Sequence, residues 1–244
     1  MAQERRVALV TGGAKRVGRA IVEKLAANGF DVAFTYLTSG DEAAEVAGAA
    51  RGAGGTALPI CADLTDPAAA AETVGRAFGA AFDRLDVLVN NASLYEPSPL
   101  KATTLAQVRR LTAIHLEAPL LLCQTFEPLL RASRGHVVNM IDVLAERPWP
   151  EYLAYCATKG ALRTLTLGLA RELAPDVTVN GIAPGVVEWP PGYPEHERKK
   201  YLKRVPLGRA GSPADVANLV HFLVTVGTYV TGDILHLDGG RSLT

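Results

Sequence analysis

The stretch VALVTGGAKRVG, residues 7–18, decides the fold. A short apolar run, VALVT, leads into a turn that carries three glycines, and a helical segment follows. Glycines between a strand and a helix let the backbone approach a pyrophosphate, whose charge then lies at the helix N-terminus. By itself such a turn is also compatible with a tight strand-to-helix connection that binds nothing. The rest of the chain must therefore decide between these readings.

Short aliphatic runs alternate with amphipathic segments along the whole sequence. This alternation is typical of a parallel sheet with crossover helices, and runs without strict polar alternation indicate strands buried on both faces. The sequence predicts one α/β domain over residues 1–244: a Rossmann-type, doubly wound, seven-stranded parallel sheet with helices on both faces. The expected strands are 7–11, 31–36, 56–62, 85–91, 135–140, 177–182 and 233–239, and the expected helices are 17–28, 41–52, 67–81, 104–131, 152–173 and 213–225.

Three local signals refine the helices. Asp66 before Pro67 and Ser212 before Pro213 predict N-caps followed by proline at the first helical position. Pro119 and Pro128 predict a kink or break inside 104–131. Residues 184–206 have no clear period, and we expect a loop there that serves as a lid or binding element.

Composition narrows the classes of partner. Among 244 residues, 48% are hydrophobic, and Lys+Arg and Asp+Glu number 25 each. A balanced charge gives no field that would gather nucleic acid or an anionic membrane, so small molecules and copies of the chain are the expected partners. Three separated cysteines with no CxxC spacing predict neither a disulfide framework nor a metal site, and they suit a reducing cytoplasm.

Cofactor choice is predicted from two places. Lys15 and Arg16 put two cations in the glycine turn, where the usual version of the turn has a further glycine. The second predicted strand ends in uncharged residues, without the Asp or Glu that would hold a ribose 2′-hydroxyl and repel a 2′-phosphate. We therefore expect NADP(H), with Arg16, Thr38 and Ser39 near the extra phosphate. Alternatively, the two hydroxyls cap the next helix.

Asp142, Tyr155 and Lys159 are the candidate catalytic residues. Tyr155 and Lys159 are spaced i, i+4 on one predicted helix face, and Asp142 ends the fifth predicted strand, whose carboxyl end opens on the ligand crevice. We expect the Lys159 ammonium to lower the pKa of the Tyr155 phenol and make it a usable acid and base. The other interpretations are a solvated helix face and, for Asp142, a turn cap.

Four segments together resemble a known family: TGGAKRVG (11–18), NNAS (90–93), YCATK (155–159) and APG (183–185). They are similar to the short-chain dehydrogenase/reductase family over essentially the whole chain. Within it, the likeness is greatest to the pteridine reductases. Arg16 in the glycine turn, the run NNASLYEPSPL (90–100), Asp142 in place of the usual catalytic serine, and DGGRSLT (238–244) carry that likeness.

The resemblance implies a role for each matching residue. Tyr155 donates the proton, Lys159 holds the nicotinamide ribose and tunes Tyr155, and Asp142 relays a proton. The substrate would contact Arg16, Ser93, Tyr95, Asp142 and Tyr155, with the Tyr95 ring stacked on a pterin. The cofactor would contact Gly12, Lys15, Arg16, Val17, Tyr36, Thr38, Ser39, Asp63, Leu64, Asn90, Ala92, Ser93, Tyr155, Lys159, Pro184 and Gly185. A homotetramer built through 104–131, 152–173 and the last strand is also implied.

Two departures from the family pattern stand out. His115, in AIHLEAP, occupies the position of an asparagine that helps bind a water in the proton relay. A histidine there could hold the same water, relay a proton or simply be buried with a backbone partner. The threonine that usually follows PG is replaced by VVEWPPGY (186–193).

Three functions follow from these residues. The leading hypothesis is an NADPH-dependent reductase that transfers a hydride to a pterin or dihydrofolate-like ring. The alternative is a short-chain carbonyl reductase, which needs Tyr155 and Lys159 but not Asp142. The third is a non-catalytic NADP(H)-binding protein, which would need none of the three.

Overall fold

A seven-stranded parallel sheet forms the centre of the protein, as described by a computed structural model for residues 5–189 and 192–244. The strand order is β3-β2-β1-β4-β5-β6-β7. The strands are β1 (Arg6–Val10), β2 (Phe30–Tyr36), β3 (Ala57–Cys61), β4 (Val87–Asn90), β5 (His136–Met140), β6 (Thr178–Pro184) and β7 (Ile234–Leu237). The order reverses between β1 and β4, and a crevice forms outside the carboxyl ends of the strands at such a switch point.

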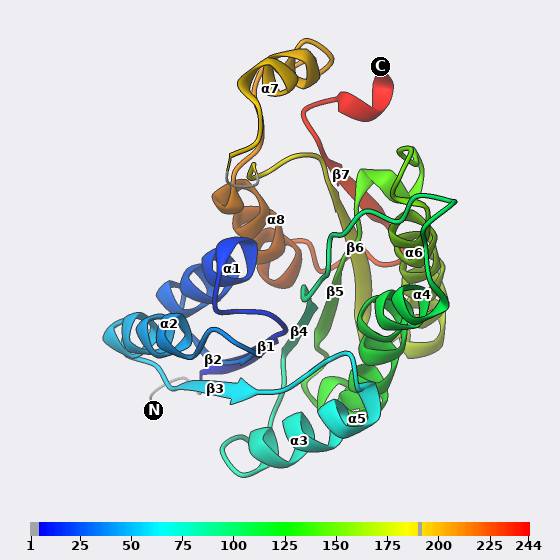
Figure 1. The fold of residues 1–244 in the computed structure, drawn as a ribbon. Helices are drawn as coiled ribbons and strands as arrows, with labels where there is room; N and C mark the ends of the chain where they lie inside the picture. Colours follow the sequence, from blue (N-terminus) through cyan, green and yellow to red (C-terminus); the bar gives the residue numbers. More distant parts are fainter. Residues whose placement is uncertain (1–4, 190–191) are drawn as a thin grey trace.

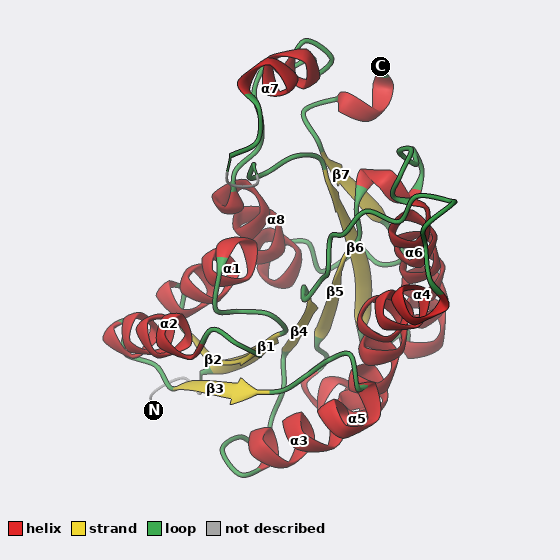
Figure 2. Cartoon of the chain, in the orientation of Figure 1, coloured by secondary structure: helices red, strands yellow, loops and turns green. Residues whose placement is uncertain are grey.

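Helices cover both faces of the sheet (Figures 1 and 2). One side carries α1 (Arg16–Ala27), α2 (Gly40–Gly52) and α8 (Pro213–Thr225); the other carries α3 (Pro67–Gly79), α4 (Leu105–Thr112), α5 (Ala118–Ser133) and α6 (Leu153–Leu173). Each side has its own apolar core, because neighbouring residues of a buried strand point to opposite faces. In β1, Ala8 and Val10 join one core while Val7 and Leu9 join the other. The doubly wound α/β fold expected from the sequence is confirmed.

Local chemistry sets the helix starts as expected. The Asp66 side chain accepts a hydrogen bond from the backbone N–H of Ala69, and Ser212 forms a capping box with Asp215. Such caps satisfy N–H groups that the first turn of a helix leaves free.

The segment predicted as one helix over 104–131 is divided. Between α4 and α5 lies a π-helix, Ala113–Glu117 (η1), immediately before Pro119. Proline removes a backbone donor from the helical ladder, and a wider turn there is one way to absorb the change. Pro128 lies inside α5 without ending it.

Residues 184–206 are not all loop, which corrects the sequence interpretation. They include α7 (Glu195–Leu202), which stands away from the body of the domain beside the C-terminal segment (Figure 1). Ion pairs such as Glu195–Lys199, 2.9 Å apart, support the helix. Only Tyr201 of α7 is buried, so the helix lacks the apolar period by which helices are recognised in a sequence. Pro190 and Pro191 of this segment lie outside the described residues.

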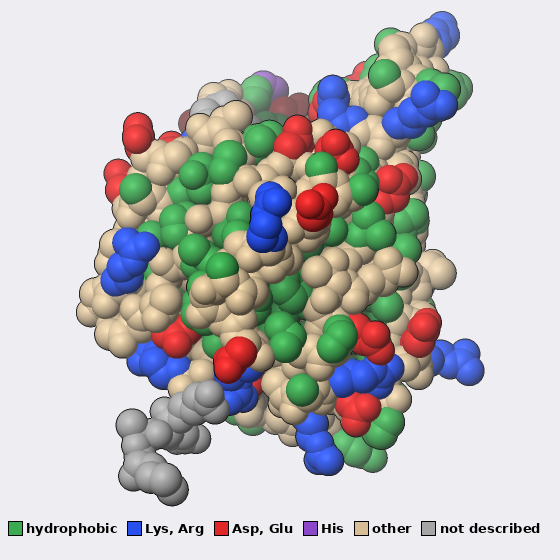
Figure 3. Space-filling model, turned by 90° about the horizontal axis from the view of Figure 1, so that it is seen from below, with side chains coloured by type: hydrophobic (Ala, Val, Ile, Leu, Met, Phe, Trp, Pro, Cys, Tyr) green, Lys and Arg blue, Asp and Glu red, His purple; other side chains and the backbone are tan. Residues whose placement is uncertain are grey.

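The surface agrees with the balanced composition. On the face drawn in Figure 3, positive and negative side chains are interspersed around hydrophobic ones. None of the helices in the described part of the chain is long and apolar enough to cross a membrane.

Candidate functional site: a dinucleotide cleft facing a buried phenol and amine

The glycine turn is shaped to receive a ligand close to its backbone. Gly12 has φ 65°, a conformation that favours glycine, and a Cβ added to Gly18 would lie 2.0 Å from the Gly12 carbonyl oxygen. The Asn91 side-chain amide donates to the Thr11 carbonyl oxygen at 2.8 Å and ties the turn to the end of β4. The backbone of this turn therefore stays open and fixed at the N-terminus of α1, as pyrophosphate binding requires.

Arg16 keeps the backbone shape of the glycine that it replaces. Its φ is 53°, in the left-handed region that side chains rarely adopt. Its guanidinium pairs with the Glu188 carboxylate, and Lys15 pairs with Glu42 at 2.7 Å. Exposed ion pairs contribute only about 0–1 kcal/mol, so either cation can exchange its partner for a phosphate.

The end of β2 bears no carboxylate. Tyr36 is partly buried, Thr38 is exposed, and Ser39 stands at the N-cap of α2 without a side-chain capping bond. The Ser39 hydroxyl is thus not engaged in the capping role that was its alternative interpretation. Glu42, one turn further on, is held by Lys15.

The remaining predicted cofactor contacts line the carboxyl ends of the strands. Asn90 donates to Asn139 at 2.8 Å, and its own Oδ1 is buried without a hydrogen-bond partner among the described residues. Asp63 is exposed and accepts from the Thr65 backbone N–H at 2.9 Å. The others lie at these same strand ends and at the start of α1: Val17, Leu64, Ala92, Pro184 and Gly185. An open glycine turn and an orphaned amide oxygen fit a dinucleotide.

Asp142, Tyr155 and Lys159 come together at the end of β5 and the first turns of α6. The Tyr155 hydroxyl donates to Asp142 Oδ2 at 2.7 Å, and Asp142 Oδ1 accepts from the Leu144 N–H at 2.9 Å. The Lys159 Nζ donates to the Met140 carbonyl oxygen at 2.8 Å and is 5.8 Å from the centre of the Tyr155 ring. Lys159 is only 2% exposed. Asp142 also caps the short turn that follows β5, which was its alternative interpretation. Its Oδ1 makes the capping bond, and its Oδ2 contacts Tyr155.

The expected lowering of the Tyr155 pKa is wrong. Burial and the adjacent Asp142 carboxyl hold the pKa of Tyr155 well above its ordinary value, because both disfavour a phenolate. Burial raises the pKa of Asp142 and lowers that of Lys159 to about 8. The Lys159 ammonium is directed at the Met140 carbonyl and not at the phenol oxygen. Tyr155 is accordingly protonated at neutral pH and is poised as a donor.

Tyr95 lies beside the Tyr155 phenol, half exposed. Its ring stacks on Tyr152 with 4.6 Å between centroids and meets Tyr155 edge-on at 4.9 Å. One face of the Tyr95 ring is therefore covered by Tyr152. A flat substrate ring would have to use the face that Tyr152 leaves free.

His115 is fully buried in the π-helix and bridges the predicted contact Ser93 and a second hydroxyl, that of Thr158. Its Nε2 is 2.8 Å from the Ser93 hydroxyl, and its Nδ1 is 2.9 Å from Thr158 Oγ1. Burial and Lys159 lower the pKa of His115 to about 2, so the ring is neutral. Of the roles open to it from the sequence, a charged relay is disfavoured.

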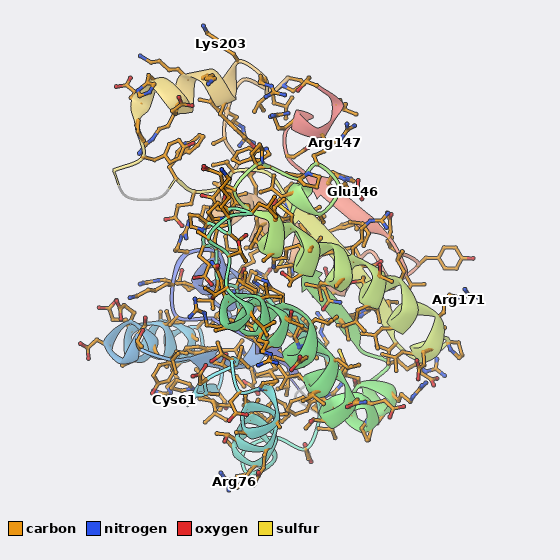
Figure 4. The ribbon with its side chains drawn as sticks, turned by 45° about the vertical axis from the view of Figure 1, so that its right-hand side comes forward. Cys61, Arg76, Glu146, Arg147, Arg171 and Lys203 are labelled. Carbon is orange, nitrogen blue, oxygen red and sulfur yellow. The ribbon has the colours of Figure 1, made fainter. Side chains whose placement is uncertain are left out.

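Loop residues after β6 border the cleft. Tyr201 of α7 accepts a hydrogen bond from the Val186 N–H at 3.2 Å, and its ring meets Trp189 edge-on at 5.4 Å. Glu146 and Arg147, labelled in Figure 4, lie just beyond the Asp142 turn, near β7 and the C-terminal segment. Glu146 pairs with Arg163 at 2.8 Å.

Sequence reasoning missed Tyr152, Thr158, Glu188 and Tyr201. Two of them had a usable signal: Tyr152 and Thr158 are three residues before and after Tyr155, which places all three near one helix face. Glu188 and Tyr201 lie in the aperiodic segment, where no pattern relates them to Arg16 or Val186. In residues 5–189 and 192–244, no three His, Cys, Asp or Glu side chains are grouped to hold a metal ion.

A dinucleotide cleft that faces a hydrogen-bonded phenol and a buried amine defines a class, the nicotinamide-dependent oxidoreductases. Comparison with known proteins gives the family. A family model described as enoyl-(acyl carrier protein) reductase matches residues 12–242. The chain belongs to the short-chain dehydrogenase/reductase family, as the resemblance in the sequence implied.

Several relatives match almost the full length. L-2,3-butanediol dehydrogenase of Corynebacterium glutamicum is 36% identical over 96% of this chain and 98% of the relative. The 3-oxoacyl-[acyl-carrier-protein] reductase of Aquifex aeolicus is 34% identical over 96% of each chain. Pteridine reductase 1 of Leishmania tarentolae is 33% identical over 98% of this chain and 96% of the relative.

Solved structures agree with the fold. A blue fluorescent protein from a metagenomic library, in complex with NADPH, is 36% identical over 97% of each chain with a TM-score of 0.89. A short-chain dehydrogenase/reductase from Serratia marcescens is 34% identical with a TM-score of 0.91, over 97% of this chain and 98% of that one.

Proposed function

We propose that this oxidoreductase reduces a C=N bond of a pterin or dihydrofolate-like ring with NADPH. The hydrogen bond of 2.7 Å between the Tyr155 hydroxyl and Asp142 carries the proposal. The reaction adds a hydride to a ring carbon and a proton to the neighbouring nitrogen. NADPH supplies the hydride when bound, and the chain must supply the proton.

The pair Asp142 and Tyr155 is suited to that proton. Burial raises the pKa of both groups, which favours their protonated forms. When Tyr155 gives its proton to a ring nitrogen, Asp142 can replace it over a single short hydrogen bond. A serine in the position of Asp142 could donate a hydrogen bond but could not give up its proton to the Tyr155 oxygen, because an aliphatic hydroxyl is a much weaker acid than a phenol.

Tyr95 and Tyr152 support a flat, aromatic substrate. Their rings are stacked at an interplanar angle of 14°, and Tyr95 is 48% exposed. Stacking of a further ring on Tyr95 would contribute roughly 0.5–1.5 kcal/mol beyond the area that it buries. Ser93 and Arg16 are the other proposed substrate contacts.

NADP(H) is the proposed cofactor. The end of β2 offers the Thr38 and Ser39 hydroxyls and no acid, and Arg16 and Lys15 are the nearest cations in the first turn. Each cation exchanges an exposed carboxylate for the phosphate. Lys159 would hold the nicotinamide ribose, since its buried ammonium lies at the base of the cleft.

A second candidate is the reduction of a carbonyl, and the comparisons favour it over the pterin. Two of the relatives are named for butanediol and 3-oxoacyl substrates and have slightly higher identity than the pteridine reductase. A protonated Asp142 could also donate to a carbonyl oxygen that gains negative charge. Overall identity, however, does not select a substrate; the side chains of the site do. A non-catalytic binding protein would not need the Asp142–Tyr155 pair.

The proposed assembly is a homotetramer in a reducing cytoplasm. An apolar groove of about 460 Å³ lies between α4 and α6, lined in part by Val108, Leu153 and Ala157. On α8 and the turn that follows it, Phe222, Val226 and Tyr229 are exposed. Both surfaces are expected to be covered by further copies. The three cysteines are free thiols, as a reducing compartment would keep them.

The test is a substrate panel. NADPH oxidation is followed with oxidised pterins, dihydrofolate, 3-oxoacyl thioesters and simple hydroxyketones, beside the Tyr155→Phe variant as a blank. Turnover of a pterin at least tenfold above that of the best ketone supports the first proposal. Turnover of ketones alone transfers the conclusion to the carbonyl candidate.

A further inference from the structure

A chain of hydrogen bonds connects α6 to the catalytic phenol through the π-helix. Thr158 Oγ1 donates to the Tyr155 carbonyl oxygen at 2.9 Å, and it lies 2.9 Å from His115 Nδ1. His115 Nε2 in turn contacts the Ser93 hydroxyl at 2.8 Å. Ser93 also lies close enough to the Tyr155 phenol to favour the phenolate and so to lower the Tyr155 pKa, against the larger effects of burial and Asp142.

The tautomer of His115 follows from its neighbours. The backbone N–H of Leu94 donates to His115 Nε2 at 3.3 Å, and a backbone N–H has no acceptor role. Nε2 must therefore be the unprotonated nitrogen, and Nδ1 carries the hydrogen that it donates to Thr158. This leaves the Thr158 hydroxyl hydrogen for the Tyr155 carbonyl oxygen, so each donor in the chain has one acceptor.

Ser93 has one hydroxyl hydrogen and two acceptors within reach. While Tyr155 is protonated, Ser93 can donate to His115 Nε2. Once Tyr155 has given its proton away, the same hydrogen can turn to the phenolate oxygen. When the Ser93 hydroxyl rotates in this way, His115 Nε2 loses its hydrogen bond from Ser93 but keeps the one from the Leu94 N–H. No buried polar atom is then left without a partner.

We propose that His115 is a positioning residue that holds Ser93 as a switchable hydrogen-bond donor to the Tyr155 oxygen and remains neutral throughout the reaction. The π-helix provides the geometry, since it puts the imidazole between the end of β4 and the second turn of α6. Single-turn π-helices recur at functional sites. The inference rests on the proposed role of Tyr155 as proton donor but not on the identity of the substrate.

Two substitutions distinguish the roles of the two His115 ring nitrogens. His115→Gln puts an amide oxygen near the place of Nε2 and keeps an acceptor for Ser93; His115→Asn reaches only towards Thr158. In His115→Asn we expect kcat to fall about tenfold, the effect of one lost hydrogen bond in the transition state, with the Kd for NADPH unchanged. His115→Gln should recover most of that loss. Equal losses in both variants would indicate a merely structural histidine.

Coupling to Ser93 is the sharper readout. Ser93→Ala should lower kcat by a similar factor, and adding His115→Asn to Ser93→Ala should lower it by less than about twofold more, because the two residues act through one hydrogen bond. Full multiplication of the two effects would overturn the proposal. A melting temperature measured on each variant identifies those that do not fold.

A measurement without substrate keeps the inference independent of the proposed activity. In the ¹⁵N-labelled wild-type protein, the His115 ring should show the neutral Nδ1–H tautomer and no titration between pH 5 and 9. The charges that face it are Lys159 directly, and Asp142 through Tyr155. An Nε2–H tautomer or a midpoint in this range would overturn the inference, whereas failure of every substrate would contradict only the proposed function.

Discussion

The start of α6 and the helix α7 border the same cleft but are built in opposite ways. Tyr155 and Lys159 are 4% and 2% exposed, and their polar atoms are directed at Asp142 and the Met140 carbonyl. Helix α7 carries exposed ion pairs and buries only Tyr201. The polar groups of α6 are thus held in the interior, where burial shifts pKa values, whereas α7 is held by few buried contacts.

This contrast predicts where substitutions act. Changes at Tyr155 should alter kcat with little effect on binding, whereas changes on α7 should alter KM. Changes in the glycine turn should have effects of intermediate size. The turn is joined to the loop before α7 by the ion pair between Arg16 and Glu188.

The largest effect is expected from Tyr155→Phe. Loss of the proton donor should lower kcat by about 10²- to 10⁴-fold, the range of general acid catalysis. The phenyl ring keeps its packing against Tyr95, so binding of NADPH, followed by fluorescence, should change less than about threefold. Activity within tenfold of wild type would mean that Asp142 or a water delivers the proton.

A pH profile tests the buried amine. The pKa of Lys159 is lowered from 10.5 to about 8 by burial, so the ammonium exists below this pH and is lost above it. If the charged form holds the cofactor, kcat/KM for NADPH should fall as the pH rises through about 8. Lys159→Met should be much less active, and its kcat/KM should show no such fall with rising pH. A flat profile to pH 10 would contradict the role given to Lys159.

Arg16→Gly removes the positive charge and keeps the backbone conformation of the turn. We expect KM for NADPH to rise about tenfold and KM for NADH to stay near its wild-type value, since one charge-assisted hydrogen bond contributes roughly 1.5 kcal/mol. The melting temperature should not fall, because glycine adopts a φ of 53° without strain. Equal changes for both cofactors would refute the choice of NADP(H).

Tyr201→Phe probes the attachment of α7. The change removes the hydrogen bond from Val186 and keeps the ring against Trp189. Loss of one partly buried hydrogen bond costs about 1 kcal/mol, so KM for the substrate should rise a few-fold with kcat nearly unchanged. A drop in kcat alone would place Tyr201 with the catalytic residues.

The smallest effect is expected on the outer face of α7. Glu195→Ala removes an exposed ion pair to Lys199 and should change the free energy of unfolding by less than about 0.5 kcal/mol. Kinetic constants should match wild type. This variant is the control for Tyr201→Phe. An equal effect of both variants on KM would mean that the effect of Tyr201→Phe is not specific to its hydrogen bond with Val186.

The sequence predicted all seven strands and the residues that meet at the end of β5. Apolar runs recognise buried strands, and the spacing of Tyr155 and Lys159 fixes their common helix face. It did not predict α7, whose polar residues carry no period, and although Pro119 predicted a break in the fourth helix, it did not predict that the break is a π-helix, Ala113–Glu117. The direction of the Tyr155 pKa also escaped it, because that depends on the burial of Asp142 and on where the Lys159 ammonium points.

The most direct test of the account is the substrate preference of Asp142→Ser. We propose that Asp142 supplies protons to Tyr155, which passes them to a ring nitrogen, and a serine cannot perform this task. We predict that kcat/KM for the preferred dihydropterin falls at least 100-fold while turnover of a simple ketone is kept or rises. A variant that reduces the pterin as well as the wild type does, or loses both activities equally, would contradict the role of Asp142.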